Sequence, residues 1–265
     1  DRIIVGRRRM RWSFMDDEWN LGVWQPHARW DYIHPRPQGL TGLFYQARED
    51  QFELTFFTSP LFLPDQGPQF EIQDGHFVSN NRWFWEPQTQ VGVFADPTRI
   101  DYQLARPTER EVVMNTSWAT QIRLGDLSDG FWLQGAYANK PMNQFHIAVN
   151  GRYAHQTGNA EAIIHPKVLR HELLALETGW SSLSRRLWLS VTRERPQTAD
   201  VPEAWFEAQL SESYFLAGSV EQELDSRYLP PSRAKVSYLH NVMSESLSGN
   251  QALGQQVQSS AQRFP

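Results

Sequence analysis

The segment from Gln144 to Ala154 alternates between apolar and polar residues, and this period constrains the fold more than any other feature of the sequence. Side chains two residues apart project from the same face of a β-strand, whereas helical spacing would scatter them. Phe145, Ile147 and Val149 therefore share an apolar face, and mostly polar residues occupy the other. The pattern predicts a strand with one oily face and one wet face.

A longer alternation runs from Glu111 to Leu124 and places Val112, Trp118 and Ile122 on one face. Its length of about 14 residues exceeds the about 5 to 6 of an ordinary soluble strand and suits a tilted membrane strand of about 9 to 11. Turn signals separate further alternating segments. These predicted strands cover residues 40–48, 51–63, 130–140, 167–180, 185–195, 203–217 and 234–246.

The segment 168–180 is rich in Leu, Glu and Ala, which favour a helix, and it is assigned as a strand from its neighbours. With that assignment, strand lengths and spacing predict an antiparallel up-and-down meander of roughly ten to twelve strands. We expect it to close into a barrel over residues 1–246. The Ser- and Gln-rich residues 247–265 are expected to form a tail or the start of a further segment.

Two proline-rich regions, 15–38 and 64–110, interrupt the meander. Proline cannot donate a ladder hydrogen bond and is excluded from central strands, so both regions are predicted to be long loops. The second region contains a compact aromatic run beside an arginine, which we interpret as a platform for a ligand or a partner. Packing of the loop on its own aromatic residues is an equal alternative. The platform residues are Arg82, Trp83, Phe84 and Trp85.

Composition excludes several classes of protein. The 25 Lys and Arg are outnumbered by 30 Asp and Glu, and the net charge of -5 without a long basic run argues against a nucleic-acid partner. Absence of cysteine excludes disulfides, thiolate metal sites and a cysteine nucleophile. No apolar run approaches the roughly 18 to 20 residues of a membrane helix, so a helical membrane protein is excluded.

A membrane β-barrel, in contrast, fits the composition. The mean hydropathy is only -0.56, yet 13% of the residues are aromatic and 11 are Trp. Barrel strands alternate lipid-facing and lumen-facing residues, which keeps the mean hydropathy low, and collect aromatic residues at the interfaces. The chain opens at Asp1 without an initiator Met or a signal peptide, so we expect a mature or trimmed product.

Sequence motifs for catalysis are lacking. There is no G-x-S-x-G elbow, H-E-x-x-H pair, P-loop or dinucleotide-binding glycine pattern. We therefore predict no catalytic residue and no cofactor. His165 and His171 lie six residues apart without a matching carboxylate, so no metal site is predicted. The triplet Asp16 to Glu18 is interpreted as a solvated loop, and a Ser–His pair from separate strands stays open.

The opening segment Val5 to Trp12, read as VGRRRMRW, places three arginines on one face of a predicted strand. With two further arginines on polar strand faces, they would line a lumen and attract an anionic solute, since a constriction lined by arginine side chains selects anions by its local field. The alternative is that they form salt bridges with carboxylates such as Glu53 and Glu111 and merely fill the barrel. The lining set is Arg7, Arg9, Arg11, Arg123 and Arg152.

Tryptophans lie on or near the predicted strand ends, where they are expected to form an interfacial girdle rather than a sugar-stacking surface. They are Trp12, Trp118, Trp132, Trp180, Trp188 and Trp205. These aromatic ends, the alternating strands and the opening VGRRRMRWSF, followed by an Asn- and Pro-bearing loop, resemble Gram-negative outer-membrane β-barrels of the porin or polysaccharide-export kind. The resemblance is architectural and covers about residues 1–245. The ending SSAQRFP departs from the C-terminal aromatic strand common in such barrels.

The resemblance implies a protein of the bacterial outer membrane, embedded in a lipid bilayer. Together with the arginine set, it predicts a conduit or export pore for an anionic solute or polysaccharide. Two alternatives stay open. One is a structural barrel with a plugged lumen that anchors a multiprotein envelope assembly. The other is a secreted β-sandwich that binds or cleaves carbohydrate, in which the alternation buries one face against a second sheet.

Overall fold

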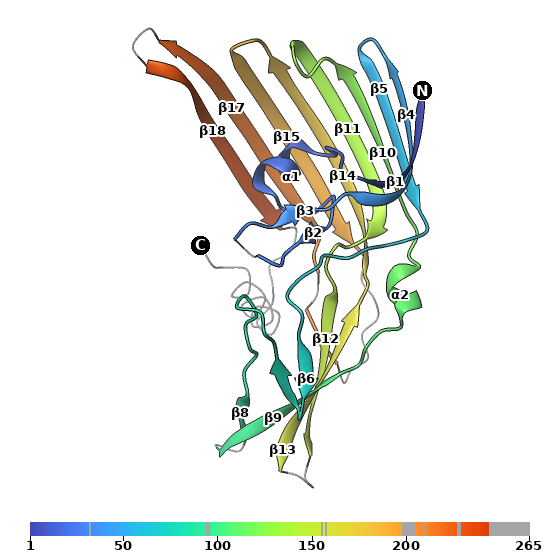
Figure 1. Ribbon diagram of the computed structural model, residues 1–265, viewed down its shortest axis with the longest axis vertical. Coiled ribbons are helices and arrows are strands. Elements are labelled where there is room, and N and C mark those ends of the chain that lie inside the picture. The colour runs from blue at the N-terminus through green and yellow to red at the C-terminus, as the bar shows by residue number, and fades with distance from the viewer. Residues whose placement is uncertain are drawn as a thin grey trace.

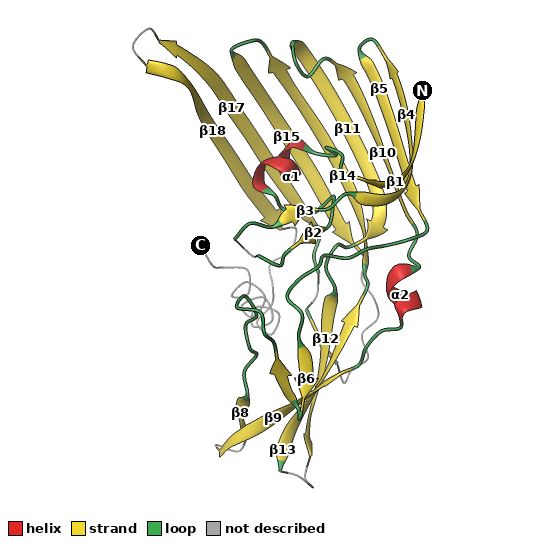
Figure 2. Cartoon of the chain, in the orientation of Figure 1, coloured by secondary structure: helices red, strands yellow, loops and turns green. Residues whose placement is uncertain are grey.

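The computed structural model describes residues 1–31, 33–93, 96–154, 156, 158–197, 205–208, 210–226 and 229–243. Two β-sheets, one of nine strands and one of five, make up most of this part of the chain (Figure 1). The two helices among the described residues, α1 (Phe14–Trp19) and α2 (Glu109–Val113), are short (Figure 2). The predicted all-β class is therefore confirmed, and the predicted tail 247–265 lies outside the described residues.

The nine-stranded sheet, called here the large sheet, is an antiparallel meander. Its strands follow one another in chain order, and every neighbouring pair is antiparallel. In spatial order they are β1 (Arg2–Arg8), β4 (Leu40–Glu49), β5 (Phe52–Ser59), β10 (Ser117–Gly125), β11 (Gly130–Pro141), β14 (Arg170–Ser181), β15 (Arg185–Pro196), β17 (Ser213–Ser226) and β18 (Leu229–Met243). The up-and-down order matches the prediction, and β14 is a strand despite its helical composition.

The large sheet is open rather than closed in the part of the chain that the structure describes. β1 and β18 are its two edges and do not pair with each other. The sheet curves around α1, which lies against its inner face (Figure 1). The meander thus has nine strands instead of ten to twelve. The strand predicted to run through Trp12 ends at Arg8.

The five-stranded sheet, called here the second sheet, lies beyond one end of the large sheet (Figures 1 and 2). Its β13 and β9 pair in parallel, and its other pairs are antiparallel. In spatial order its strands are β16 (Phe206–Glu207), β12 (His146–Ala154), β13 (Asn159–Lys167), β9 (Asp96–Leu104) and β8 (Gln90–Val93). The cleanest alternating segment, now β12, therefore belongs to this sheet and not to the meander, and β13 was not predicted.

The strand predicted over Glu111 to Leu124 is wrong in its first half. Thr108 and Glu111 form a capping box that starts α2, and the strand β10 begins only at Ser117. The capping box satisfies backbone N–H groups of a first helical turn, which explains why a helix replaces the expected strand. The strand predicted over 203–217 is also displaced, because β17 begins at Ser213.

The two regions predicted to be long loops contain regular structure. Region 15–38 holds most of α1 and the short pair β2 (His27–Ala28) and β3 (Arg36–Pro37). Region 64–110 holds β8, β9 and the hairpin of β6 (Glu71–Gln73) and β7 (His76–Val78). Asp74 and Gly75, both with positive φ, form the turn of that hairpin. Pro97 is tolerated because it is the second residue of β9.

Candidate membrane interface

The outer face of the large sheet carries large apolar side chains that are exposed. On β14, Leu174, Leu176 and Trp180 point outward, whereas Leu173 and Glu177 on the other face are buried. The same alternation recurs on the other long strands of the sheet. The apolar belt, as we call the outward set, comprises Ile3, Val5, Leu43, Phe52, Phe56, Trp118, Ile122, Leu124, Phe131, Leu174, Leu176, Trp180, Leu187, Leu189, Val191, Tyr214, Leu216, Val220, Leu224, Val236, Tyr238 and Val242.

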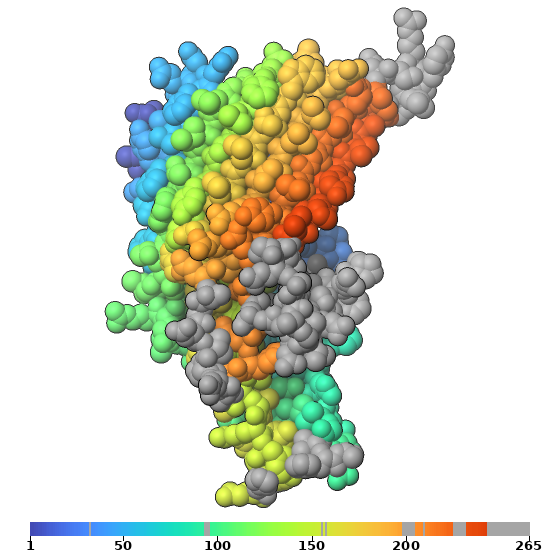
Figure 3. Space-filling model, turned by 180° about the vertical axis from the view of Figure 1, so that it is seen from behind, coloured from blue at the N-terminus to red at the C-terminus, as the bar shows by residue number. Residues whose placement is uncertain are grey.

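Strand register joins these side chains into continuous rows. Ile122, Leu176, Val191 and Leu216 align across β10 to β17, with Gly135 of β11 between the first two. Their exposed fractions are 45%, 58%, 46% and 41%. Figure 3 shows these strands side by side on one continuous surface, from the blue N-terminal strands to the red β18. Monomeric soluble proteins rarely expose an apolar patch of more than a few hundred Å².

Polar and aromatic groups border the belt at the end nearer the second sheet. There Arg193 contacts both carboxylate oxygens of Glu212, at 2.7 and 3.0 Å, and the Tyr214 hydroxyl donates to Glu212 at 2.6 Å. These bonds, first from Arg193 and then from Tyr214, lower the pKa of Glu212 to about 2. Trp118 of β10 and Tyr137 of β11 are diagonal neighbours there, with ring centroids 5.1 Å apart. At this end the belt is therefore bordered by aromatic rings and by polar groups that form hydrogen bonds.

At the opposite end, Phe131 and Trp180 are paired in register on β11 and β14. From Leu174 to Trp180 the apolar face of β14 spans roughly 20 Å at about 3.3 Å per residue. Of the tryptophans predicted to form a girdle, Trp118 and Trp180 are exposed on this face, whereas Trp12, Trp132 and Trp188 are buried in the interior. Trp205 lies against His165 of the second sheet, at 5.9 Å.

The inner face of the large sheet is covered by residues 9–24, called here the plug. Trp12 and Trp24 stack with centroids 6.0 Å apart and pack with Phe44 and Phe57 of the sheet. Phe14 stacks on Trp132 at 4.7 Å. These large rings are all buried, so the plug completes the hydrophobic core of the large sheet.

Glu177, in the middle of β14, holds the plug in place. Its carboxylate accepts hydrogen bonds from the Ser13 hydroxyl at 2.7 Å and the Phe14 backbone N–H at 2.9 Å. Ser190 donates to it at 2.9 Å and Gln134 at 3.1 Å. Glu177 is only 1% exposed, so every one of these bonds is formed away from water. The carboxylate thus fixes the start of α1 against the sheet.

Asp16 links α1 to the last residues of the plug through hydrogen bonds. It accepts from the backbone N–H groups of Val23 at 2.9 Å and Trp24 at 3.1 Å, which turns the chain back after α1. Burial raises its pKa to about 6, against the effect of those two bonds. The interpretation of Asp16 to Glu18 as a solvated loop is therefore wrong for Asp16. Asp17 pairs with Arg11 at 3.1 Å, and Glu18 pairs with Lys235 of β18.

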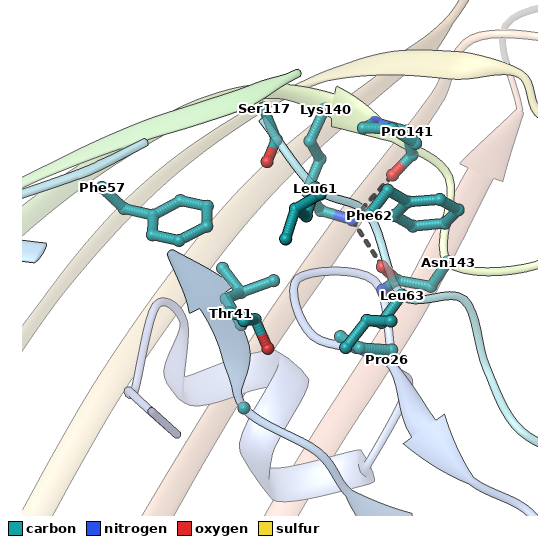
Figure 4. Close-up of a pocket in the computed structure, with 12 residues that line it drawn as sticks. Pro26, Thr41, Phe57, Leu61, Phe62, Leu63, Ser117, Lys140, Pro141 and Asn143 are labelled. Atoms are coloured by element: carbon teal, nitrogen blue, oxygen red, sulfur yellow. Dashed lines mark hydrogen bonds between the residues drawn. The ribbon is translucent and has the colours of Figure 1, made fainter. Parts of the chain in front are cut away.

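A buried lysine lies where the plug meets the end of the sheet (Figure 4). Lys140 donates to the Asn143 side chain at 2.7 Å and to the Pro141 carbonyl at 3.1 Å. Thr41 and Ser117 line a cavity of about 20 Å³ beside it. That volume holds about one water molecule, far below the several hundred Å³ of a ligand pocket.

The arginines predicted to line a lumen are not gathered on one strand face. Arg7 donates to the Gly39 carbonyl at 3.3 Å and to the Gln38 side chain, and Arg9 lies exposed beyond the end of β1. Arg11 pairs with Asp17 of the plug. Arg8, and not Arg7, lies on the inner face of β1 together with Ile4, and it donates to Gln46 at 2.7 Å.

The other two predicted lining residues lie in different sheets. Arg123 is on the inner face of β10 and forms a salt bridge with Glu53 of β5, one of the two carboxylates named as possible partners. Arg152 is on β12 of the second sheet and pairs with Glu161 at 2.6 Å. The other named carboxylate, Glu111, caps α2 instead. The set of five is therefore spread over both sheets.

Of the residues predicted to form a loop platform, some pack against other aromatic rings and others are exposed. Phe84 packs with Phe70 and Phe77, at 5.7 and 6.1 Å between centroids. Arg82 lies over the Trp83 ring at 4.7 Å, and Trp85 is 79% exposed. Packing of the loop on its own aromatic residues is thus confirmed for Phe84, and the platform for a ligand or a partner stays a prediction.

The two histidines considered for metal binding are on different strands. His171 is buried on β14 and bonds to Glu194 at 2.6 Å, whereas His165 is on β13. Within the described ranges, no group of three or more potential metal ligands comes together. None of the described helices has the length and apolar character needed to cross a membrane.

No protein-family model matches this chain, and no curated protein matches it in sequence. Function is therefore inferred from the apolar belt and the filled interior. The key interior residue, Glu177, was missed by sequence reasoning. The available signal was its position in the run LLALETGW, two residues after Ala175 and four after Leu173 on the buried face of the strand.

Proposed function

We propose that the large sheet is the lipid-facing wall of a β-barrel in a bacterial outer membrane. The apolar belt carries this proposal. A bilayer hydrocarbon core requires an outward apolar band about 25 Å tall with aromatic residues at both borders. The exposed rows from Trp118 and Tyr214 to Phe131 and Trp180 have this order. In an aqueous medium the same surface would promote aggregation.

A soluble β-sandwich agrees less well with the arrangement of the two sheets. In a sandwich the second sheet packs about 10 Å from the first and covers its apolar face. Here the second sheet lies beyond the end of the large sheet, while belt residues such as Leu176 and Leu189 remain more than half exposed. The covering partner that fits this face is lipid.

Within the barrel, the filled interior favours an anchor over an open conduit. A conduit for an anionic solute or polysaccharide needs a polar passage along the inner face. The plug occupies that face with Trp12, Phe14 and Trp24, and Glu177 fixes it through buried hydrogen bonds. Arg123 is neutralised by Glu53 rather than directed into open space. We propose that the protein anchors an envelope assembly and presents the second sheet to its partners.

Reconstitution tests both parts of this proposal. The protein should sediment with membranes, resist washing with alkaline carbonate and be extracted only by detergent. In planar bilayers it should give no steady conductance, because the plug is part of the hydrophobic core. Protein that stays monomeric in detergent-free buffer would overturn membrane embedding. Anion-selective conductance that falls in the Arg123→Gln variant would overturn the anchor and restore the conduit.

A further inference from the structure

The two ends of the large sheet differ in how its strands are connected. At one end the connections are tight turns, at Asp50–Gln51, residues 126–129 and residues 182–184, and Ser226 of β17 pairs with Leu229 of β18 at the same end. At the other end all four connections are long. They are residues 9–39, 60–116, 142–169 and 197–212, and they contain both helices and every strand of the second sheet. In Figure 1 the tight turns are at the top and the second sheet is at the bottom.

This division is complete, because no tight turn occurs at the end bearing the second sheet among the described strands. Outer-membrane barrels have short turns on the periplasmic side and longer loops on the extracellular side. We propose that the end bearing the second sheet faces the cell exterior and that the tight turns face the periplasm. The inference rests on the proposed membrane embedding and adds a direction to it.

The direction determines which molecules the second sheet meets. The loop that precedes β8, with exposed Trp85 and the stacked pair Arg82 and Trp83, is then displayed at the cell surface together with the sheet. The anchored assembly is therefore extracellular, built from partners that reach the protein from the medium. A periplasmic partner would instead contact the tight turns, where Leu183 is 99% exposed but little surface is offered.

The absence of cysteine makes this direction measurable, since a single introduced thiol is the only one in the chain. Glu86→Cys places a thiol at an exposed position beside Trp85, and Leu183→Cys places one in a tight turn. Intact Gram-negative cells expressing either variant are treated with a bulky polyethylene-glycol maleimide that does not cross the outer membrane. Wild-type protein controls for labelling without a thiol.

We expect the Glu86→Cys protein to be labelled in intact cells and the Leu183→Cys protein only after the outer membrane is permeabilised. The reverse pattern, in protein that still fractionates with membranes, would overturn the direction and leave the embedding intact. Labelling of both or of neither in intact cells, again with membrane-bound protein, would also overturn the direction. Recovery of both variants in the soluble fraction would overturn the embedding itself.

Discussion

The two sheets of this protein use the same sequence alternation in different surroundings. Strand β14 of the large sheet and β12 of the second sheet both expose apolar residues from one face, such as Leu176 and Ile147. In the second sheet, however, proline or small residues pair with several of these positions: Ile147 pairs with Pro166 and Tyr153 with Ala160. In the large sheet, rows of apolar residues continue across most strands. Alternation within one strand thus indicates a strand, and only its repetition across neighbours in register indicates a surface for lipid.

The largest difference between the sheets is expected for a carboxylate in each. Glu177→Ala removes the shared acceptor of Ser13, Phe14 and Ser190 inside the large sheet. Buried donors left without a partner should lower the free energy of unfolding by about 3 to 5 kcal/mol. The matched change in the second sheet, Glu161→Ala, breaks a partly exposed pair and should cost at most about 1 kcal/mol. Urea titration in detergent micelles measures both, and similar losses would contradict the anchoring role of Glu177.

The second largest difference between the sheets is expected when an arginine is introduced on the apolar face of each. Leu176→Arg places a cation in the middle of the belt, where an arginine facing lipid costs about 2 to 4 kcal/mol. Ile147→Arg is the control, because its side chain is 45% exposed but belongs to the second sheet. An exposed surface change there should alter stability by no more than about 0.5 kcal/mol. The readout is the fraction of protein assembled in liposomes. Equal assembly of the two variants would show that the belt does not face lipid.

Asp16 gives the plug a contribution to stability that depends on pH. The pKa of Asp16 is about 6 in the folded protein and 3.8 ordinarily, so between these values the folded form binds a proton that the unfolded form lacks. The contribution of Asp16 to stability should therefore fall by about 2 to 3 kcal/mol as pH rises from about 4 to about 6. Burial lowers the pKa of His27, whose contribution is lost as pH falls, so the two groups act in opposite directions.

The Asp16→Asn variant isolates the first of these contributions. Unfolding of wild type and variant is followed at several pH values between 4 and 8. We expect the free energy of unfolding of the wild type, minus that of the variant, to fall by about 2 to 3 kcal/mol between about pH 4 and pH 6. A difference between the two proteins that stays constant over this range would show that Asp16 does not titrate there.

The smallest effect is expected for the ion pair between Arg123 and Glu53. Both side chains are about one-sixth exposed on the inner face, near the tight turns. A double-mutant cycle with Arg123→Gln and Glu53→Gln should give a coupling energy of about 1 kcal/mol, because the pair is only partly shielded from water. A coupling near zero would show that Arg123 is available for other partners, as the conduit hypothesis requires.

Much of the meander could be read from the sequence, because alternation survives wherever a strand separates two environments. β14 was assigned from its neighbours alone, because the run LLAL conceals the alternation of buried Leu173 and Ala175 with exposed Leu174 and Leu176. The assignment of β12 to the meander was wrong, because alternation does not specify which sheet a strand joins. The helix α2 replaced part of a predicted strand although its capping box, Thr108 and Glu111, is visible in the sequence.

The plug is the part that local patterns could not predict. β1 ends at Arg8, and the chain then turns into the interior. The Gln25 side chain accepts from the Met10 backbone N–H at 3.0 Å and donates to the Met10 carbonyl at 2.6 Å, which holds the chain at this turn. Contacts between residues so distant along the chain, such as Ser13 with Glu177, have no local signature. The prediction that Arg7, Arg9 and Arg11 form a row depended on a strand that continues to Trp12. Because β1 ends at Arg8, the three arginines do not share one strand face.

Lipid contact at the belt is the most direct test of the account. Spin labels are attached to Leu176→Cys and, as a control, to Ile147→Cys in the otherwise cysteine-free chain, and both proteins are reconstituted in liposomes. Electron paramagnetic resonance then compares relaxation by oxygen, which concentrates in hydrocarbon, with relaxation by a water-soluble nickel complex. We predict that the label at 176 responds to oxygen and not to nickel, and that the label at 147 responds to nickel. A strong nickel response at both positions would contradict the proposal that the large sheet faces lipid.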